Sequence, residues 1–118
     1  MTIKQEITVR DQCLILTSPF QVVSSGLVNC VQAEFSFADD WSLYEKRYAV
    51  WSNGFNKVIT LLDDHGRCVV PCEVLDRVSP VSVNLVGEHI RNGKVIYRIT
   101  TYALTPLRVI AFSRLGND

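Results

Sequence analysis

A chain of 118 residues has the length of one domain and can bury a core without disulfides or metals. Apolar residues make up 47% of it and charged residues 20%, which is typical of globular proteins and excludes a disordered chain. Twelve basic residues balance twelve acidic ones, so no concentrated positive charge is present to attract nucleic acid or an anionic membrane. We therefore expect one domain over residues 1–118, without a nucleic-acid or membrane partner.

The chain shows no targeting or membrane-spanning signal. No apolar run approaches the ~20 residues that a membrane-spanning helix needs. The first ten residues, MTIKQEITVR, contain no apolar stretch of the kind that a signal peptide requires. We expect the protein to be made in a cytoplasm.

The first half of the chain consists of short apolar or alternating segments separated by polar turns. The expected strands cover residues 3–9, 13–16, 27–37, 47–51 and 57–62. Asp39 and Asp40 precede Trp41, and one of them is expected to cap a single helical turn over residues 41–46. A second single turn is expected over residues 71–75.

The second half of the chain continues this pattern. Asp63–Gly66 is expected to form a hairpin turn into a strand over 67–70, and Asn92-Gly93 is the strongest hairpin signal in the sequence. Further strands are expected over 81–87, 95–102 and 107–112, with a frayed tail over 113–118. Eight or nine short strands without a sustained helical period predict an all-β fold, an antiparallel β-sandwich of jelly-roll or immunoglobulin type.

Four cysteines, at positions 13, 30, 68 and 72, lie in apolar strand-like runs. A structural zinc site needs two close pairs of ligands, and Cys13 and Cys30 do not form one. A cytoplasmic origin disfavours disulfides. We expect four buried free thiols and no cofactor, with a disulfide and a metal site as weaker alternatives.

Signals for catalysis are sparse. The sequence contains no GxSxG, Walker, HExxH or GxGxxG motif, and His65 and His89 lie in or beside predicted turns. The sequence has two acid pairs, Asp39-Asp40 and Asp63-Asp64. The two carboxylates of each pair point to opposite faces of an extended chain, which favours turn formation over catalysis or calcium binding. We expect a protein that is not an enzyme; a small hydrolase or metalloenzyme is the weakest hypothesis.

The aromatic residues supply the candidate core and interface positions. Phe35, Phe37 and Trp41 are expected in the core, with Trp41 closing one end of the sandwich. Trp51 ends a strand just before a loop that contains Phe55, so both a buried position and an interface position are open for it.

An uncharged extended segment, residues 100–106, is typical of a sheet edge or a subunit contact. The candidate interface residues are therefore Trp51, Phe55, Tyr102 and Leu104. A rival interpretation is a carbohydrate-binding module, in which Trp51, Ser52 and Asn53 form a stacking platform for cell-wall glycans.

An ordered series of short motifs carries a family resemblance. The series runs Phe35-Ser36-Phe37, Asp40-Trp41, Arg47-Tyr48-Ala49-Val50-Trp51, Val58–Leu61, Asp63–Gly66, then Cys68, Pro71, Glu73 and Leu75, then Val81–Gly87, and finally Arg98, Thr100 and Thr101. Over about residues 28–102 this series resembles the N-terminal β-sandwich domain of tail-fibre and upper-baseplate proteins of tailed phages of Gram-positive hosts.

The resemblance implies an adaptor that fixes a fibre or receptor-binding element to the virion, often as a trimer, without catalytic residues. It implies structural roles for Trp41 and Pro71. Family members usually continue into a fibre or receptor domain, whereas this sequence stops at Asp118, so a capsid decoration or head-fibre attachment protein stays open. We expect a virion structural protein of the tail or capsid surface that binds other virion proteins and itself.

Overall fold

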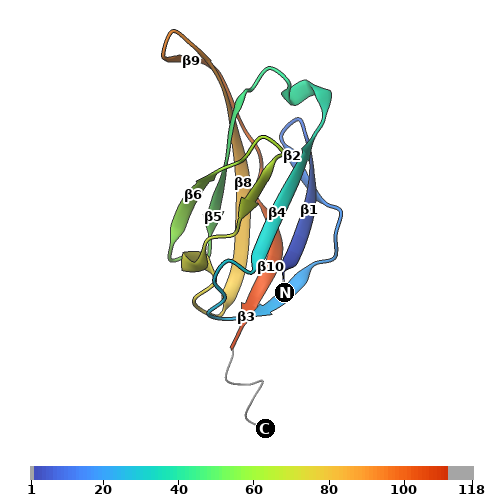
Figure 1. Cartoon of the computed structure of the whole chain (residues 1–118), viewed down its shortest axis with the longest axis vertical. Coiled ribbons are helices and arrows are strands. Elements are labelled where there is room, and N and C mark those ends of the chain that lie inside the picture. The colour runs from blue at the N-terminus through green and yellow to red at the C-terminus, as the bar shows by residue number, and fades with distance from the viewer. Residues whose placement is uncertain (1, 112–118) are drawn as a thin grey trace.

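Two β-sheets packed face to face make up the computed structural model, which describes residues 2–111 (Figure 1). The all-β sandwich is confirmed, with ten strands where eight or nine were expected. The strands are β1 (Ile3–Arg10), β2 (Cys13–Leu16), β3 (Gln21–Ser24), β4 (Val31–Phe37), β5 (Lys46–Ser52), β6 (Lys57–Leu61), β7 (Arg67–Val69), β8 (Ser79–Arg91), β9 (Lys94–Thr100) and β10 (Leu104–Ile110). Two short 3₁₀ turns, η1 (Asp39–Trp41) and η2 (Cys72–Val74), lie in the connections.

The strand order differs from that of a purely antiparallel sandwich. The four-stranded sheet has the order β2-β1-β4-β7, and the six-stranded sheet has the order β3-β10-β8-β5-β6, with β9 also paired to β8. Two pairings, β1 with β4 and β3 with β10, are parallel. The parallel pairing of β1 with β4 arises because β3 carries the chain across to the six-stranded sheet before β4 returns beside β1.

Two local predictions are corrected. Strand β3 was not expected, because Pro19 and the Ser24-Ser25-Gly26 run surround it and its signal is only four residues long. The turn Asp63–Gly66 forms, but β6 and β7 belong to different sheets, so the turn links the sheets instead of closing a hairpin. Phe35 of β4 donates its backbone N–H to the Gly66 carbonyl at 2.8 Å, which holds the turn against the four-stranded sheet.

The core lies between the sheets and follows the strand alternation read from the sequence. Phe35 and Trp41 are buried in it, while Phe37 is partly buried and packs against it. Gln5 shares the inner row of β1 with Ile7 and Val9 and donates its amide to the Pro106 carbonyl of β10 at 2.8 Å. This bond joins the two sheets through a buried polar side chain. Pro71 is partly buried and stands at the N-cap of η2.

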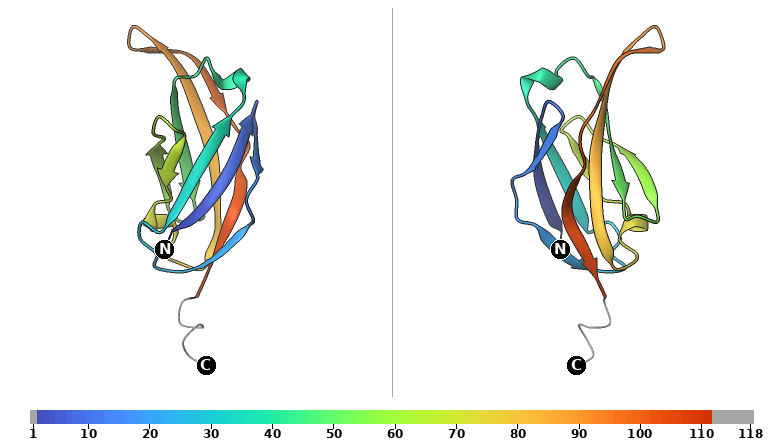
Figure 2. Two further views of the ribbon diagram at one scale, coloured as in Figure 1. Left: turned by 45° about the vertical axis from the view of Figure 1, so that its right-hand side comes forward. Right: turned by 180° about the vertical axis from the view of Figure 1, so that it is seen from behind.

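The hairpin of β8 and β9 extends past the sandwich (Figure 2). Strand β5 last pairs with β8 at Glu88, and β10 pairs only with the first part of β8. Residues 89–97, which we call the arm, therefore pair only with one another among the described residues. Asn92 and Gly93 have φ angles of 53° and 76°, as a tight hairpin turn requires, so the predicted Asn-Gly hairpin is confirmed.

Candidate functional site

Trp41 closes the end of the sandwich from which the arm projects. Its indole is fully buried, and Nε1 donates to the Asp11 carbonyl at 2.8 Å. Its ring lies 5.2 Å from that of Phe37 and 5.6 Å from that of Tyr44, measured between centroids. Gly87 of β8 provides the space, because a Cβ there would lie 2.5 Å from Trp41 Cζ3. Trp41 is therefore a plug of the core and not a binding residue.

Arg47 of β5 fixes the loop that carries this plug. Its Nε donates to the Tyr44 carbonyl and its Nη2 to the Trp41 carbonyl, both at 2.8 Å. The guanidinium also lies 4.1 Å from the centre of the Phe37 ring, and partial burial lowers the pKa of Arg47. The turn expected over residues 41–46 with an aspartate cap was a wrong prediction: the turn is η1, over Asp39–Trp41, and Ala38 is its N-cap.

One member of each acid pair accepts backbone hydrogen bonds in a turn. Asp40 accepts a hydrogen bond from the backbone N–H of Asp11 at 2.8 Å, so its carboxylate bridges two turns. Asp63 accepts hydrogen bonds from the backbone N–H groups of Arg67 and His65, which lower the pKa of Asp63. Within residues 2–111, no three or more His, Cys, Asp and Glu side chains are arranged to hold a metal ion.

A pocket of about 350 Å³ lies beside the β6–β7 turn. Three of its lining residues are the acids Glu45, Asp63 and Asp64, which we call the acidic rim. All three residues are exposed. Arg47 also lines the pocket, so the rim has an excess of negative charge with one cation beneath it.

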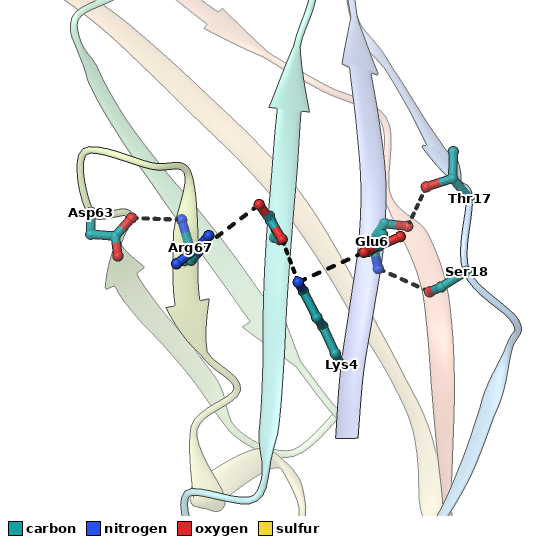
Figure 3. Close-up of polar contacts among 7 residues, drawn as sticks. Lys4, Glu6, Thr17, Ser18, Asp63 and Arg67 are labelled. Atoms are coloured by element: carbon teal, nitrogen blue, oxygen red, sulfur yellow. Dashed lines mark hydrogen bonds and ion pairs between the residues drawn. The ribbon is translucent and has the colours of Figure 1, made fainter. Parts of the chain in front are cut away.

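The outer face of the four-stranded sheet is polar and charged (Figure 3). Lys4 of β1 lies 2.9 Å from Glu34 of β4 and 3.8 Å from Glu6, and Arg67 of β7 lies 3.6 Å from Glu34. Ser18 accepts a hydrogen bond from the backbone N–H of Glu6 at the β2 side of the sheet. Exposed pairs of this kind contribute little stability and are typical of a hydrated surface.

The outer face of the six-stranded sheet is apolar by comparison. The strand register places Tyr48 of β5 between Leu61 of β6 and Val86 of β8, and places Val50 beside Ile59. We call these five residues the apolar face. Ile59 and Leu61 are 63% and 65% exposed, and they line a groove of about 380 Å³ together with Tyr48 and the charged residues Lys46 and Glu88.

A buried carboxylate separates this face from the arm. Glu88 is almost completely buried and accepts hydrogen bonds from Arg98 Nε at 2.8 Å and from the Tyr48 hydroxyl at 3.2 Å. Lys46 lies 3.9 Å from its second oxygen. The hydrogen bond from Arg98 lowers the pKa of Glu88, so the group is ionised at neutral pH. This cluster joins β5, β8 and β9 at the base of the arm.

The arm is held at its root and is apolar along its length. Glu45 accepts a hydrogen bond from the backbone N–H of Ile90 at 2.7 Å, which lowers the pKa of Glu45. His89 lies 2.9 Å from the same carboxylate and stacks on Tyr97. Three consecutive apolar side chains of β9, at positions 95–97, are between 43% and 56% exposed. The base of the arm is therefore ordered by polar contacts while its sides are open to solvent.

The predicted interface residues do not gather at one place. Phe55 is exposed in the β5–β6 loop beneath Arg77, whose guanidinium lies 4.2 Å from the ring centre. Tyr102 is exposed after β9 and donates its backbone N–H to Gln12, in the turn after β1. Leu104 is half-buried and packs against the core.

The expectation that Trp51 lies at an interface is corrected. Its side chain is fully buried, and Nε1 donates to the Thr60 hydroxyl at 3.1 Å. The alternation of β5 places Trp51 on the inner row with Ala49, in register with Val83 of β8. Asn53 is also buried, so the platform expected for a glycan is not on the surface.

Sequence reasoning missed the apolar face. Residues 57–62 were recognised as a strand, but neither of its faces was assigned to the surface. The available signal was that both rows of this strand are apolar or nearly so, with Val58 on one and Ile59 and Leu61 on the other. A strand that is apolar on both rows predicts burial on both faces.

The cysteines are free thiols in the described structure. Cys13 and Cys72 are exposed, because each begins an element at the surface, so the expectation of burial was wrong for these two. Cys30 and Cys68 are partly buried, and burial raises the pKa of Cys68.

Comparisons with known proteins give no family for this chain: no protein-family model and no curated protein matches it. Among residues 2–111, the structure contains no helix with the length and apolar character needed to cross a membrane.

Proposed function

We propose that this chain is a non-enzymatic structural protein that assembles through protein–protein contacts with other copies of itself and with other proteins. The observation that carries the proposal is the contrast between the two outer faces of the sandwich. One face carries the ion pairs of Glu34 with Lys4 and Arg67 and exposes apolar side chains only singly among the described residues, whereas the other exposes Ile59 and Leu61 together beside Tyr48. Contiguous apolar surface of this kind marks interaction sites in soluble proteins.

The edge of the same sheet adds a second mode of contact. Strand β6 pairs only with β5 within the described residues, so one of its edges carries no strand. An open edge beside an apolar face can accept a strand from a partner, with the backbone supplying affinity and the side chains specificity. A specific interface buries roughly 1,600 Å² in total, which one sheet face and edge of this size can contribute to.

We propose further that the assembly is a phage virion, with the chain as an adaptor for tail-fibre or baseplate components and a trimer as the favoured oligomer. The sandwich fold and the buried position of Trp41 support this, since the resemblance over residues 28–102 implies both. A capsid decoration or head-fibre attachment protein is the alternative. The burial of Trp51 removes the expected sugar platform, so we favour assembly over glycan binding.

The assembly proposal is tested by placing charge on the apolar face. The variant Ile59→Lys with Leu61→Lys should be monomeric by light scattering at concentrations where the unchanged protein is oligomeric. The matched control is Ile15→Lys with Val69→Lys, which adds the same charge at exposed apolar positions of the four-stranded sheet. An unchanged oligomer in the first variant, or equal loss in both, would count against the apolar face as an interface.

The location is tested on particles. An antibody raised against the purified chain should label virions produced from the genome that encodes it, at the tail for a fibre adaptor and at the head for a decoration protein. Failure to label both intact and disrupted particles would refute the virion assignment.

A further inference from the structure

We propose that the arm of one copy docks on the apolar face of a second copy, with the cationic tip of the arm against the acidic rim. This inference rests on the proposed self-assembly and names the surfaces that would carry it. The occupant of the apolar face is thus a second copy of this chain.

The arm itself lacks a partner for its apolar surface. Residues 89–97 pair only with one another in the described part of the chain, and a two-stranded hairpin is marginally stable in water without packing. Val95, Ile96 and Tyr97 follow one another in β9, so successive side chains place apolar surface on both sides of the ribbon. A ribbon that is apolar on both sides fits a groove better than a flat hydrated surface.

The charges of the arm are concentrated at its tip. The turn at its end is flanked by Arg91 and Lys94, both exposed, and Arg91 Nε donates to a neighbour on the arm, His89, at 3.2 Å. From root to tip, the arm therefore presents an apolar shaft followed by two cations.

The receiving surface has the same order with the opposite charge. Strand β6 carries Ile59 and Leu61, and only the buried Leu62 separates its end from Asp63 and Asp64 of the rim. An arm laid along this strand from Ile59 toward its carboxyl end meets apolar side chains first and carboxylates last. Opposite charges placed at the end of an apolar contact fix its direction and register.

Among the described residues, the arm contacts the rim of its own copy through Glu45, and it does so with its root and not with Arg91 or Lys94 at its tip. Glu45 holds the root of the arm through Ile90 and His89, and from there the hairpin projects away from the sandwich (Figure 2). Among the described residues, the Asp63 carboxylate bonds only within its own turn and none pairs with the Asp64 carboxylate, so both are left for another molecule. A contact between two different surfaces is heterologous, and such contacts close into rings, including trimers.

Charge reversal with rescue tests the contact. The tip variant is Arg91→Glu with Lys94→Glu. The rim variant is Asp64→Lys with Ser42→Lys, because Ser42 is exposed and lines the same pocket as the rim, and it leaves the turn-forming Asp63 in place. Each should weaken self-association at least about tenfold, measured as the dissociation constant by light scattering and sedimentation. A chain that carries all four changes should have a dissociation constant within about threefold of that of the unchanged protein.

A matched control reverses two exposed cations that belong to neither the arm nor the rim, Arg10→Glu with Arg108→Glu, and should leave the dissociation constant unchanged. Thermal melting checks that each variant folds. If a variant fails to fold, hydrogen exchange on the unchanged protein supplies the result: assembly should protect amides of residues 57–61 and 94–98 together.

The outcomes separate this inference from the function on which it rests. An unchanged protein that stays monomeric would remove self-assembly itself and with it the docking. Assembly that persists in the tip variant, that is not restored by the four changes together, or that leaves residues 94–98 unprotected, would overturn the arm contact while self-assembly stands.

Discussion

Replacement of Gly87 by alanine tests how tightly the Trp41 plug is packed. The new Cβ would lie 2.5 Å from Trp41 Cζ3 and 2.9 Å from Tyr44 Cβ. Carbon atoms pack best at about 3.5–4.0 Å, so the indole would have to move by about 1 Å. Overpacking of this kind costs about 1–3 kcal/mol. Such a movement also strains the 2.8 Å hydrogen bond from Nε1 to the Asp11 carbonyl, which contributes about 1 kcal/mol.

We therefore expect Gly87→Ala to lower the free energy of unfolding by about 2–4 kcal/mol. Urea unfolding followed by tryptophan fluorescence measures this, with the buried Trp51 as a second reporter. In a Trp41→Phe background the clashing indole atoms are absent, so the same alanine should cost at least about 1 kcal/mol less. An alanine that costs less than about 0.5 kcal/mol, or the same in both backgrounds, would refute the packing account.

Three further outcomes follow from local contacts. Gly93→Ala places a side chain at φ 76°, so it should speed amide exchange in residues 94–97 while the melting temperature falls little; slowed exchange would contradict this. Ionised Glu88 stabilises the fold above its unfolded pKa of about 4.3, and this stabilisation is lost as the pH falls through its lower folded pKa. The difference in melting temperature between the unchanged protein and Glu88→Gln should therefore be constant from about pH 6 to 8 and narrow below about pH 4. Cys13 and Cys72 should react quickly with a thiol reagent, and Cys68 only on unfolding; rapid native reaction of Cys68 would contradict its burial.

The sequence predicts the fold class well because the pattern of a sandwich is local. Alternation in β1 and β4 identifies the inner rows, including the buried Gln5, and Asn92-Gly93 identifies the one tight turn with two positive φ angles. The inner position of Trp51 also follows this alternation, since it shares a row with Ala49. The sequence interpretation placed Trp51 among the interface residues because a loop follows it.

The pairing of strands and the surface pattern need tertiary information. Nothing local to Asp63–Gly66 shows that β6 and β7 leave the turn for different sheets, because the turn chemistry is the same in both cases. The length of β8 is likewise set by β5 and β9 pairing on its two sides, past the polar residues at 88 and 89. The exposure of Ile59 and Leu61 depends on β6 being an edge strand with nothing packed over it in the described residues.

The most direct test of the central claim is the molar mass of the unchanged protein by light scattering over a wide concentration series. The apolar face and the arm predict a concentration-dependent oligomer, favoured as a trimer, that weakens with added salt because surface charges at the rim and tip are screened. A monomer at every concentration, in low and high salt alike, would contradict self-assembly through these surfaces.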